Sequence, residues 1–333
     1  MLRALVALVV LASCDPPADG PHPQAPYDQA PPGFATPPED SPPPPEPQPE
    51  PEVDLTTAGI SVGKRYVFAF DGGKIELELR RDQDRVIEVA RNHYAVPIVM
   101  QWQLDNVVNL APLAPPGGVA VLPAAPVPNG VGAGVVLTTE RIMDPTSSFH
   151  RELSFHARFG SPAAQPIDYA YRLPYRKGKT FSVLQGPHGA FSHRGSNEYA
   201  VDFDCPVATH VVAARDGIVV AANASATGHG TTPGYLELSR VNFVLVLHDD
   251  GTLGEYMHLS PSGVEVQPGT RVQRGEEIAL SGNTGFSSTP HLHFQVMTAA
   301  DDGIAARSFP FRFATGPGRS EDPIQGRAYP SWE

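Results

Sequence analysis

The feature that most constrains the fold is a proline-rich segment near the start of the chain. Of the 37 prolines in 333 residues, 16 lie between Pro16 and Pro51. Proline fixes φ and has no backbone N–H, so a segment this rich in proline cannot pack as helix or sheet. It favours the extended polyproline II conformation instead. We therefore expect the folded part of the chain to begin near residue 54.

The same segment carries much of the negative charge. Residues 15–54 contain nine acidic residues and no Lys or Arg, whereas residues 55–333 hold 23 basic and 27 acidic residues. The folded part is therefore nearly neutral, and without a basic face we expect no nucleic-acid partner. Residues 14–53 are expected to form a disordered, Pro- and acid-rich linker that reaches up to about 120 Å. A role as a recognition ligand is the alternative.

The first residues have the composition of an export signal. One cation, Arg3, precedes an apolar stretch over residues 4–12, and small residues stand directly before Cys14. The ending Leu11-Ala12-Ser13-Cys14 resembles the lipobox of bacterial lipoproteins. This resemblance implies a lipoprotein signal peptide over residues 1–13 and a membrane anchor through lipidated Cys14. An ordinary cleaved signal that contains a cysteine is the alternative.

Nothing after this signal predicts a membrane span. No later apolar run approaches the roughly 18 residues that cross a bilayer, so we expect no integral membrane protein. The implied location is the bacterial envelope, facing the periplasm, with inner and outer membrane both open. If Cys14 carries lipid, Cys205 has no partner, which excludes a disulfide framework and a Cys-based zinc site.

Residues 54–177 show the hydrophobic period of two that is typical of half-buried strands. Apolar residues alternate over residues 75–79, 98–104 and 153–159, with Pro and Gly clusters between these stretches. The pattern predicts a small β-sandwich. Because this domain carries no cluster of reactive side chains, we expect it to space or position the domain that follows.

Residues 178–333 also predict strands, here as short apolar runs between turn dipeptides. Residues 243–248 and 255–259 predict the two strands of a hairpin. The whole folded part is therefore expected to be mainly β.

Alternation along two of these strands should gather imidazoles on one face. We expect Tyr256 and His258 to share one face of their strand, and His291, His293 and Gln295 to share one face of theirs. The apolar residues between them should face the core. Histidines at positions i and i+2 of a strand lie about 6.5–7 Å apart, so one ring can bind a metal while the other reaches a water beside it.

Several short motifs occur in a fixed order along this second domain. They are His193-Arg194-Gly195, Ala200-Val201-Asp202-Phe203, Ala213-Ala214-Arg215-Asp216-Gly217, Tyr256-Met257-His258-Leu259, Ser281-Gly282-Asn283-Thr284-Gly285 and Pro290-His291-Leu292-His293-Phe294. This succession resembles the lysostaphin/LytM-type zinc metallopeptidases, which are endopeptidases that cut bacterial cell-wall peptides. The resemblance covers about residues 178–300. It implies an antiparallel β peptidase domain, the duplicated hybrid motif, followed by a C-terminal extension.

Carried over residue by residue, the resemblance implies Zn²⁺ bound by His193, Asp202 and His293. It makes His291 the general base and His258 a second imidazole beside the metal. Two imidazoles and one carboxylate leave a fourth position open, as in catalytic zinc sites. Histidine suits proton transfer because its unperturbed pKa of about 6.5 lies near working pH.

Three points of this assignment stay open in the sequence. His193 and Asp202 are nine residues apart, whereas four is common in the family. His188 is therefore an alternative to His193, and Asp204 is an alternative to Asp202. Gln295 occupies a place where a carboxylate is frequent, and it could tune the site.

The function implied is hydrolysis of peptide bonds in peptidoglycan stem peptides or cross-links, with D,D-cross-links expected rather than glycine bridges. The rival is a non-catalytic wall-binding or amidase-activating protein on the same fold. Such proteins typically lose metal ligands, and none is missing here by residue type. The first domain could also occlude the substrate groove. Residues 226–234, rich in glycine, are expected to form a loop beside this groove or an exposed connector.

Overall fold

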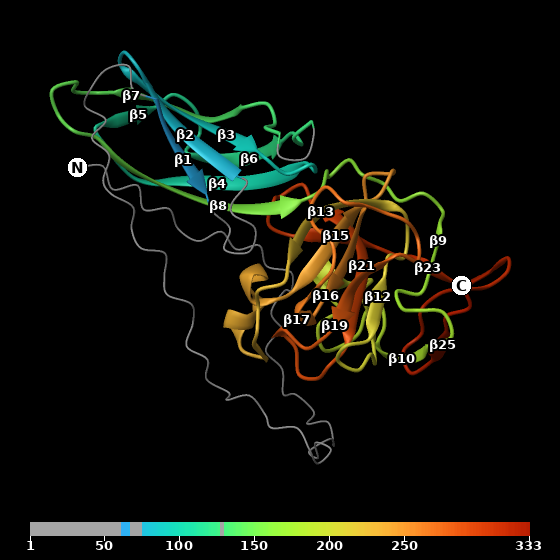
Figure 1. Ribbon diagram of the computed structural model, residues 1–333. Helices are drawn as coiled ribbons and strands as arrows, with labels where there is room; N and C mark the ends of the chain where they lie inside the picture. Colours follow the sequence, from blue (N-terminus) through green and yellow to red (C-terminus); the bar gives the residue numbers. More distant parts are fainter. Residues whose placement is uncertain (1–60, 67–74, 127–129) are drawn as a thin grey trace.

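The computed structural model describes residues 61–66, 75–126 and 130–333 (Figure 1). The expected signal peptide, Cys14 and the linker lie outside the described residues. Within those ranges the helical segments are three short 3-10 helices, η1 (Gly195–Asn197), η2 (Pro233–Leu236) and η3 (Leu238–Arg240). None of the helices in these ranges has the length and apolar character needed to cross a bilayer. Strands form the rest of the regular structure, so the expectation of a mainly β fold is confirmed.

Two antiparallel sheets make up the first part of the described chain. The larger has the order β1 (Ser61–Tyr66), β2 (Ile75–Asp82), β3 (Arg85–Asn92), β7 (Val135–Ile142), β5 (Leu110–Pro112). The smaller has the order β6 (Gly117–Leu122), β4 (Ile98–Val108), β8 (His150–Phe159). Ile75 and Leu77 of the larger sheet and Trp102 and Phe155 of the smaller one belong to one buried cluster. The sheets therefore pack face to face, and the three predicted alternating stretches lie in β2, β4 and β8.

A nine-stranded sheet forms the centre of the second part. Its order is β18 (Arg271–Val272), β13 (Gly217–Asn223), β15 (Phe243–Leu247), β16 (Leu253–Met257), β21 (Leu292–Ala299), β11 (Val201–Phe203), β10 (Thr180–Gln185), β25 (Ala328–Pro330), with β22 (Ala306–Phe309) also paired to β21. The predicted hairpin is confirmed, because β15 and β16 pair antiparallel from Phe243 opposite Met257 to Leu247 opposite Leu253.

Smaller sheets surround this one. They are β12 (His210–Val212), β19 (Glu277–Ser281) and β17 (Leu259–Val264), then β14 (His229–Gly230) with β20 (Gly285–Phe286), then β24 (Arg319–Glu321), β23 (Arg312–Gly316) and β9 (Ala170–Tyr171). Val211 and Ile278 of the β12-β19-β17 sheet share a buried cluster with Leu292, Phe294 and Val296 of β21. A hydrophobic core thus lies between the two sheets.

The predicted alternation holds along β21 but fails around His258. Leu292, Phe294 and Val296 are buried in the core, as predicted. Tyr256 also lies in that core, its ring 5.1 Å from the ring of Phe294, so it does not share a face with His258. The prediction for this pair was wrong because β16 ends at Met257 and His258 has the left-handed φ of 61°. Regular alternation requires extended backbone, which this residue lacks.

A second hydrophobic cluster runs from the sandwich into the nine-stranded sheet. Tyr94 and Phe159 of the sandwich belong to the same cluster as Leu245, Met257 and Met297 of the sheet. Cross-strand partners share one face, and Met257 is the partner of His293. The sandwich therefore packs on the same face of the sheet that carries His293.

One buried ion-pair cluster ties the two sheets of the sandwich together. Arg151 of β8 places Nη2 2.6 Å from Glu88 Oε2 of β3, and Nη1 3.1 Å from Glu140 Oε2 of β7. All three residues are buried. Removing the guanidinium would take a counter-charge away from two carboxylates in a poorly solvated space.

We predict that Arg151→Met lowers the free energy of unfolding by about 3–5 kcal/mol, because both carboxylates lose the guanidinium that faces them. Urea unfolding followed by circular dichroism measures this change. Arg80→Met is the matched control, since Arg80 pairs with Glu78 at the surface. This variant should barely change the midpoint of urea unfolding. Equal midpoints for the two variants would contradict the prediction.

A second stability prediction concerns His248, which is buried with Nδ1 2.9 Å from the carbonyl oxygen of Asp216. Burial lowers its pKa to about 4. Because the unfolded pKa is about 6.5, the unfolded chain takes up a proton first as the pH falls. Stability is therefore present above about pH 6.5 and is lost toward pH 4, by about 3 kcal/mol at most.

His248→Gln should show a smaller loss of stability between pH 7 and pH 4 than the wild type. Urea unfolding at several pH values measures the difference. His210→Gln, which replaces a histidine whose side chain is 38% exposed, is the control, and its stability should still fall between pH 7 and pH 4. A wild-type pH dependence in His248→Gln would rule out this origin of the effect.

Candidate metal centre

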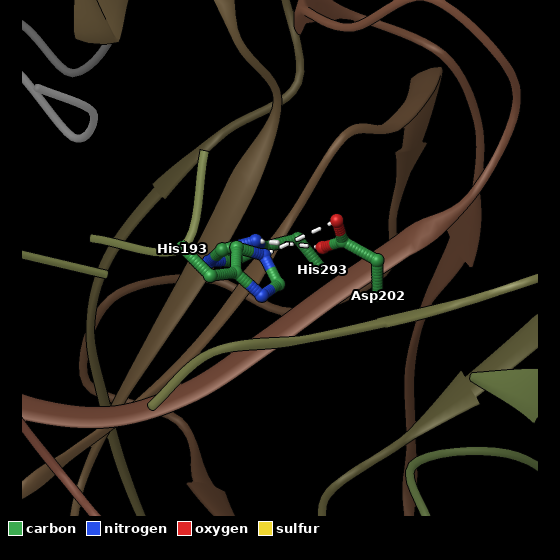
Figure 2. Close-up of side chains that lie close together, drawn as sticks. All are labelled: His193, Asp202 and His293. Atoms are coloured by element: carbon green, nitrogen blue, oxygen red, sulfur yellow. Dashed lines mark hydrogen bonds and ion pairs between the residues drawn. The ribbon is translucent and has the colours of Figure 1, made fainter. Parts of the chain in front are cut away.

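The three predicted metal ligands lie together in the second part of the chain (Figure 2). Donor atoms of His193, Asp202 and His293 all lie within 4.8 Å of one another. His193 Nε2 is 3.2 Å from Asp202 Oδ2, and His293 Nδ1 is 2.9 Å from Asp202 Oδ1. All three side chains are buried. The carboxylate thus stands between two imidazoles and contacts both.

Sheet register explains how two of these residues meet. Asp202 of β11 and His293 of β21 are direct cross-strand partners in an antiparallel pair. Directly opposed side chains share a face and lie close together. Val201 and Phe203, on either side of Asp202, point into the core on the opposite face. The apolar neighbours therefore fix which way the carboxylate points.

His193 reaches the site from the connection between β10 and β11. This connection contains η1 and then joins β11 at Val201, which accommodates the nine-residue spacing between His193 and Asp202. The His193 ring places Nδ1 2.9 Å from the carbonyl oxygen of Gly186. A carbonyl only accepts hydrogen bonds, so Nδ1 is the donor and Nε2 faces Asp202.

The other two predicted histidines adjoin this group, and both are held in the same way. His258 places Nδ1 2.7 Å from the carbonyl oxygen of Thr284, and His291 places Nδ1 2.7 Å from that of Thr289. Each ring therefore turns its Nε2 away from these carbonyls, and that of His291 is 3.7 Å from Asp202 Oδ1. The two rings lie 4.4 Å apart between centroids. The structure thus brings all five predicted residues together.

The alternatives left open by the sequence lie elsewhere. His188 is exposed and pairs with Glu198 at 3.3 Å, and Asp204 is exposed. Neither contributes to the described group of possible metal ligands. Gln295 is buried near the group, as the alternation of β21 requires.

Two further residues at this site were not found from the sequence. Glu255 is the cross-strand partner of Gln295, accepts a 2.5 Å hydrogen bond from its Nε2, and lies 3.9 Å from His293 Nε2. Alternation gave no signal for Glu255, because Met257, two residues further on, was expected to face the core. Gln185 donates a hydrogen bond of 3.1 Å to Asp202 Oδ2. A single glutamine outside every motif of the sequence analysis gave no signal.

Burial and neighbouring charges set the protonation of this group. Burial opposes the charge on Asp202, but His193 and His291 hold the pKa of its carboxyl well below the usual range. Burial lowers the pKa of His258 and of His293, and nearby imidazoles lower both further. Burial opposes the charge on His193, whereas Asp202 raises the pKa of this ring overall. The site therefore offers one ionised carboxylate, and at His258 and His293 imidazoles whose charged form is disfavoured.

This donor set fits a bound cation. His193 Nε2 is buried and makes no hydrogen bond, although it faces a carboxylate oxygen. Buried polar atoms are nearly always paired, so a lone pair facing a carboxylate needs a proton or a metal ion between them. Two imidazoles and one carboxylate are a ligand set typical of catalytic zinc.

The glycine-rich residues 226–234 lie next to this group. They include β14, which pairs in parallel with β20 so that His229 opposes Gly285. Gly285 directly follows Thr284, whose carbonyl holds His258. Within β20, Phe286 stacks on the half-exposed Phe191, with ring centroids 6.1 Å apart. An aromatic edge therefore borders the imidazole cluster on this side.

Comparison with known proteins places these residues in a family. Residues 196–304 match the model of Peptidase family M23. The glycyl-glycine endopeptidase ALE-1 of Staphylococcus capitis is 38% identical over 146 residues, which are 43% of this chain and 35% of that protein. Lysostaphin of Staphylococcus simulans is 32% identical over 161 residues, 48% of this chain and 29% of that protein.

The peptidoglycan DD-endopeptidase ShyA of Vibrio cholerae is 35% identical over 96 residues, 29% of this chain and 19% of that protein. The chain thus spans about a third or less of the length of these relatives. The family match contains Asp202, His258, His291 and His293, and it begins three residues after His193. The resemblance seen in the motifs is confirmed, and the chain carries a domain of peptidase family M23 with lysostaphin among its homologues.

Proposed function

We propose that this chain is a zinc metalloendopeptidase that hydrolyses peptide bonds in peptidoglycan stem peptides or cross-links. The observation that carries the proposal is the meeting of His193, Asp202 and His293 within 4.8 Å, beside the imidazoles of His258 and His291. A non-catalytic member of the same fold has no need of this intact set.

In this proposal His193, Asp202 and His293 hold the zinc ion. When bound, zinc acts as a Lewis acid on a carbonyl oxygen and can bring the pKa of a water from 15.7 to about 7. The protein's part is to keep an anionic carboxylate between the imidazoles of His193 and His293. The low pKa of Asp202 and the burial of His293 serve this purpose.

His291 is the proposed general base. Its Nδ1 is engaged by the Thr289 carbonyl, which leaves Nε2 on the side of Asp202 to accept a proton from the attacking water. The same nitrogen can then return the proton to the leaving amine. His258, fixed by the Thr284 carbonyl, can accept a hydrogen bond from that water and orient it.

The similarity to ShyA, a peptidoglycan endopeptidase, supports peptidoglycan as substrate, but the relatives differ in the bond that they cut. ALE-1 is a glycyl-glycine endopeptidase and ShyA is a DD-endopeptidase. We propose D,D-cross-links as the bond cut by this chain, in the bacterial envelope. Purified sacculi from bacteria with each type of cross-link, digested and separated by chromatography, distinguish the two.

We predict that His293→Ala abolishes both stoichiometric zinc binding and hydrolysis of sacculi, because one of three ligands is lost. Elemental analysis and release of soluble muropeptides measure these two quantities. A chelator should have the same effect on the wild type, and zinc should restore it. The surface variant His210→Ala is the matched control and should retain both properties. Hydrolysis that persists in His293→Ala or in chelator would remove zinc from the mechanism.

His291→Ala is predicted to keep its zinc but to lose about 10²–10⁴-fold in kcat, since only the proton transfer is removed. Elemental analysis and initial rates on sacculi separate the two effects. A folded, zinc-bound wild type that binds sacculi without hydrolysing them would favour the non-catalytic alternative.

We also propose that the chain is held at a membrane through lipidated Cys14, which lies outside the described residues. Cys14→Ser should move the protein from the membrane pellet to the soluble fraction, because the acyl chains provide the anchor. Cys205→Ala, which changes the buried cysteine of the folded part, is the control and should stay in the pellet. Immunoblots of the fractions measure this, and an unchanged distribution of Cys14→Ser would overturn the anchor.

A further inference from the structure

We propose that Gln185 is a positioning residue of the metal centre, which orients Asp202 and fixes the segment that carries His193. The inference rests on the proposed function, since it assigns to Gln185 a part in holding the zinc ligands.

The side-chain amide of Gln185 uses both of its ends. Nε2 donates to Asp202 Oδ2 at 3.1 Å and to Ser192 Oγ at 2.9 Å. Oε1 accepts from the backbone N–H of Phe191 at 3.0 Å and of Ser192 at 3.2 Å. Because the side chain is buried, these four hydrogen bonds satisfy the amide without water. One side chain thus links a proposed ligand to the two residues directly before His193.

A β-bulge creates this contact. β10 pairs with β11 through Val183 opposite Phe203 and Gln185 opposite Asp202, with a register shift between them. Without the shift, antiparallel pairing would place Gln185 opposite Val201 and turn its amide away from the carboxylate. Leu184, the extra residue, is left 39% exposed. Bulges often re-aim a side chain next to an active site.

The segment after β10 is shaped around the same amide. A Cβ added at Gly189 would lie 2.2 Å from Gln185 Cγ, so only glycine lets the backbone pass this close. The carbonyl of Gly189 accepts from the N–H of His193 at 3.1 Å, and that of Gly186 holds the His193 ring. The path from β10 to His193 therefore folds over Gln185.

An amide is chemically suited to this role. It holds Asp202 Oδ2 through a neutral donor, so the carboxylate keeps its full charge for a cation. Hydrogen-bond partners of metal ligands commonly change metal affinity by about 10–100-fold. We assign an effect of this size to Gln185.

The test is zinc affinity, measured on the full-length protein by competition with a chromophoric chelator. Gln185→Met keeps the size of the side chain and removes all four hydrogen bonds, so we expect the Kd for zinc to rise about 10–100-fold. Gln103→Met is the matched control, because the Gln103 amide contacts the Leu104 carbonyl in the sandwich, and its Kd should equal that of the wild type. Urea unfolding of the metal-free variants reports any loss of stability separately.

Ser192→Ala is a milder variant that removes one partner of the amide and leaves Gln185 in place. It should weaken zinc binding in the same direction by a smaller factor, which keeps the test valid if Gln185→Met fails to fold. Wild-type zinc affinity in both variants, with only their stability reduced, would overturn the positioning role alone. A wild-type protein that binds no zinc would overturn the proposed function together with this role.

Discussion

The centre depends on one cross-strand pair, Asp202 opposite His293. Two adjacent antiparallel strands bring a carboxylate and an imidazole to 2.9 Å, and the remaining side chains are arranged around this contact. A slip of one residue in either strand would send one of the two side chains into the core. Phe203, Leu292 and Phe294 prevent such a slip, because they are fully buried on the opposite face and would have to enter the site. Hydrophobic packing therefore secures the polar geometry.

Irregular backbone brings in the histidines that the sheet does not. His258 follows the end of a strand with φ of 61°, and His193 lies in a long connection. In each case a backbone carbonyl accepts from Nδ1 and fixes the orientation of the ring. Positioning by main-chain groups is independent of the side chains nearby, which explains how a connection of unusual length can still deliver a ligand to its place.

Much of this arrangement could be predicted from sequence, and the failures have physical causes. Strict alternation along β21 predicted that His291, His293 and Gln295 share a face, because a regular strand has a period of two. The same rule failed at His258, where one left-handed residue interrupts the period. The contact of Gln185 with Asp202 depends on a bulge, and neither bulges nor positive φ at a histidine leave a periodic signal. The succession of motifs, which does not depend on periodicity, assigned His193 and His258 to the site.

The apolar cluster shared by the sandwich and the nine-stranded sheet has a mechanical consequence. Separating the two would expose Met297 and Met257 along with Phe159, at a cost of about 25 cal/mol for each Å² of apolar surface. Met257 is also the cross-strand partner of His293. The interface with the sandwich and the imidazole therefore lie on directly paired residues of the same sheet. A pull or a load on the sandwich is therefore transmitted directly to the strand that bears the reactive groups.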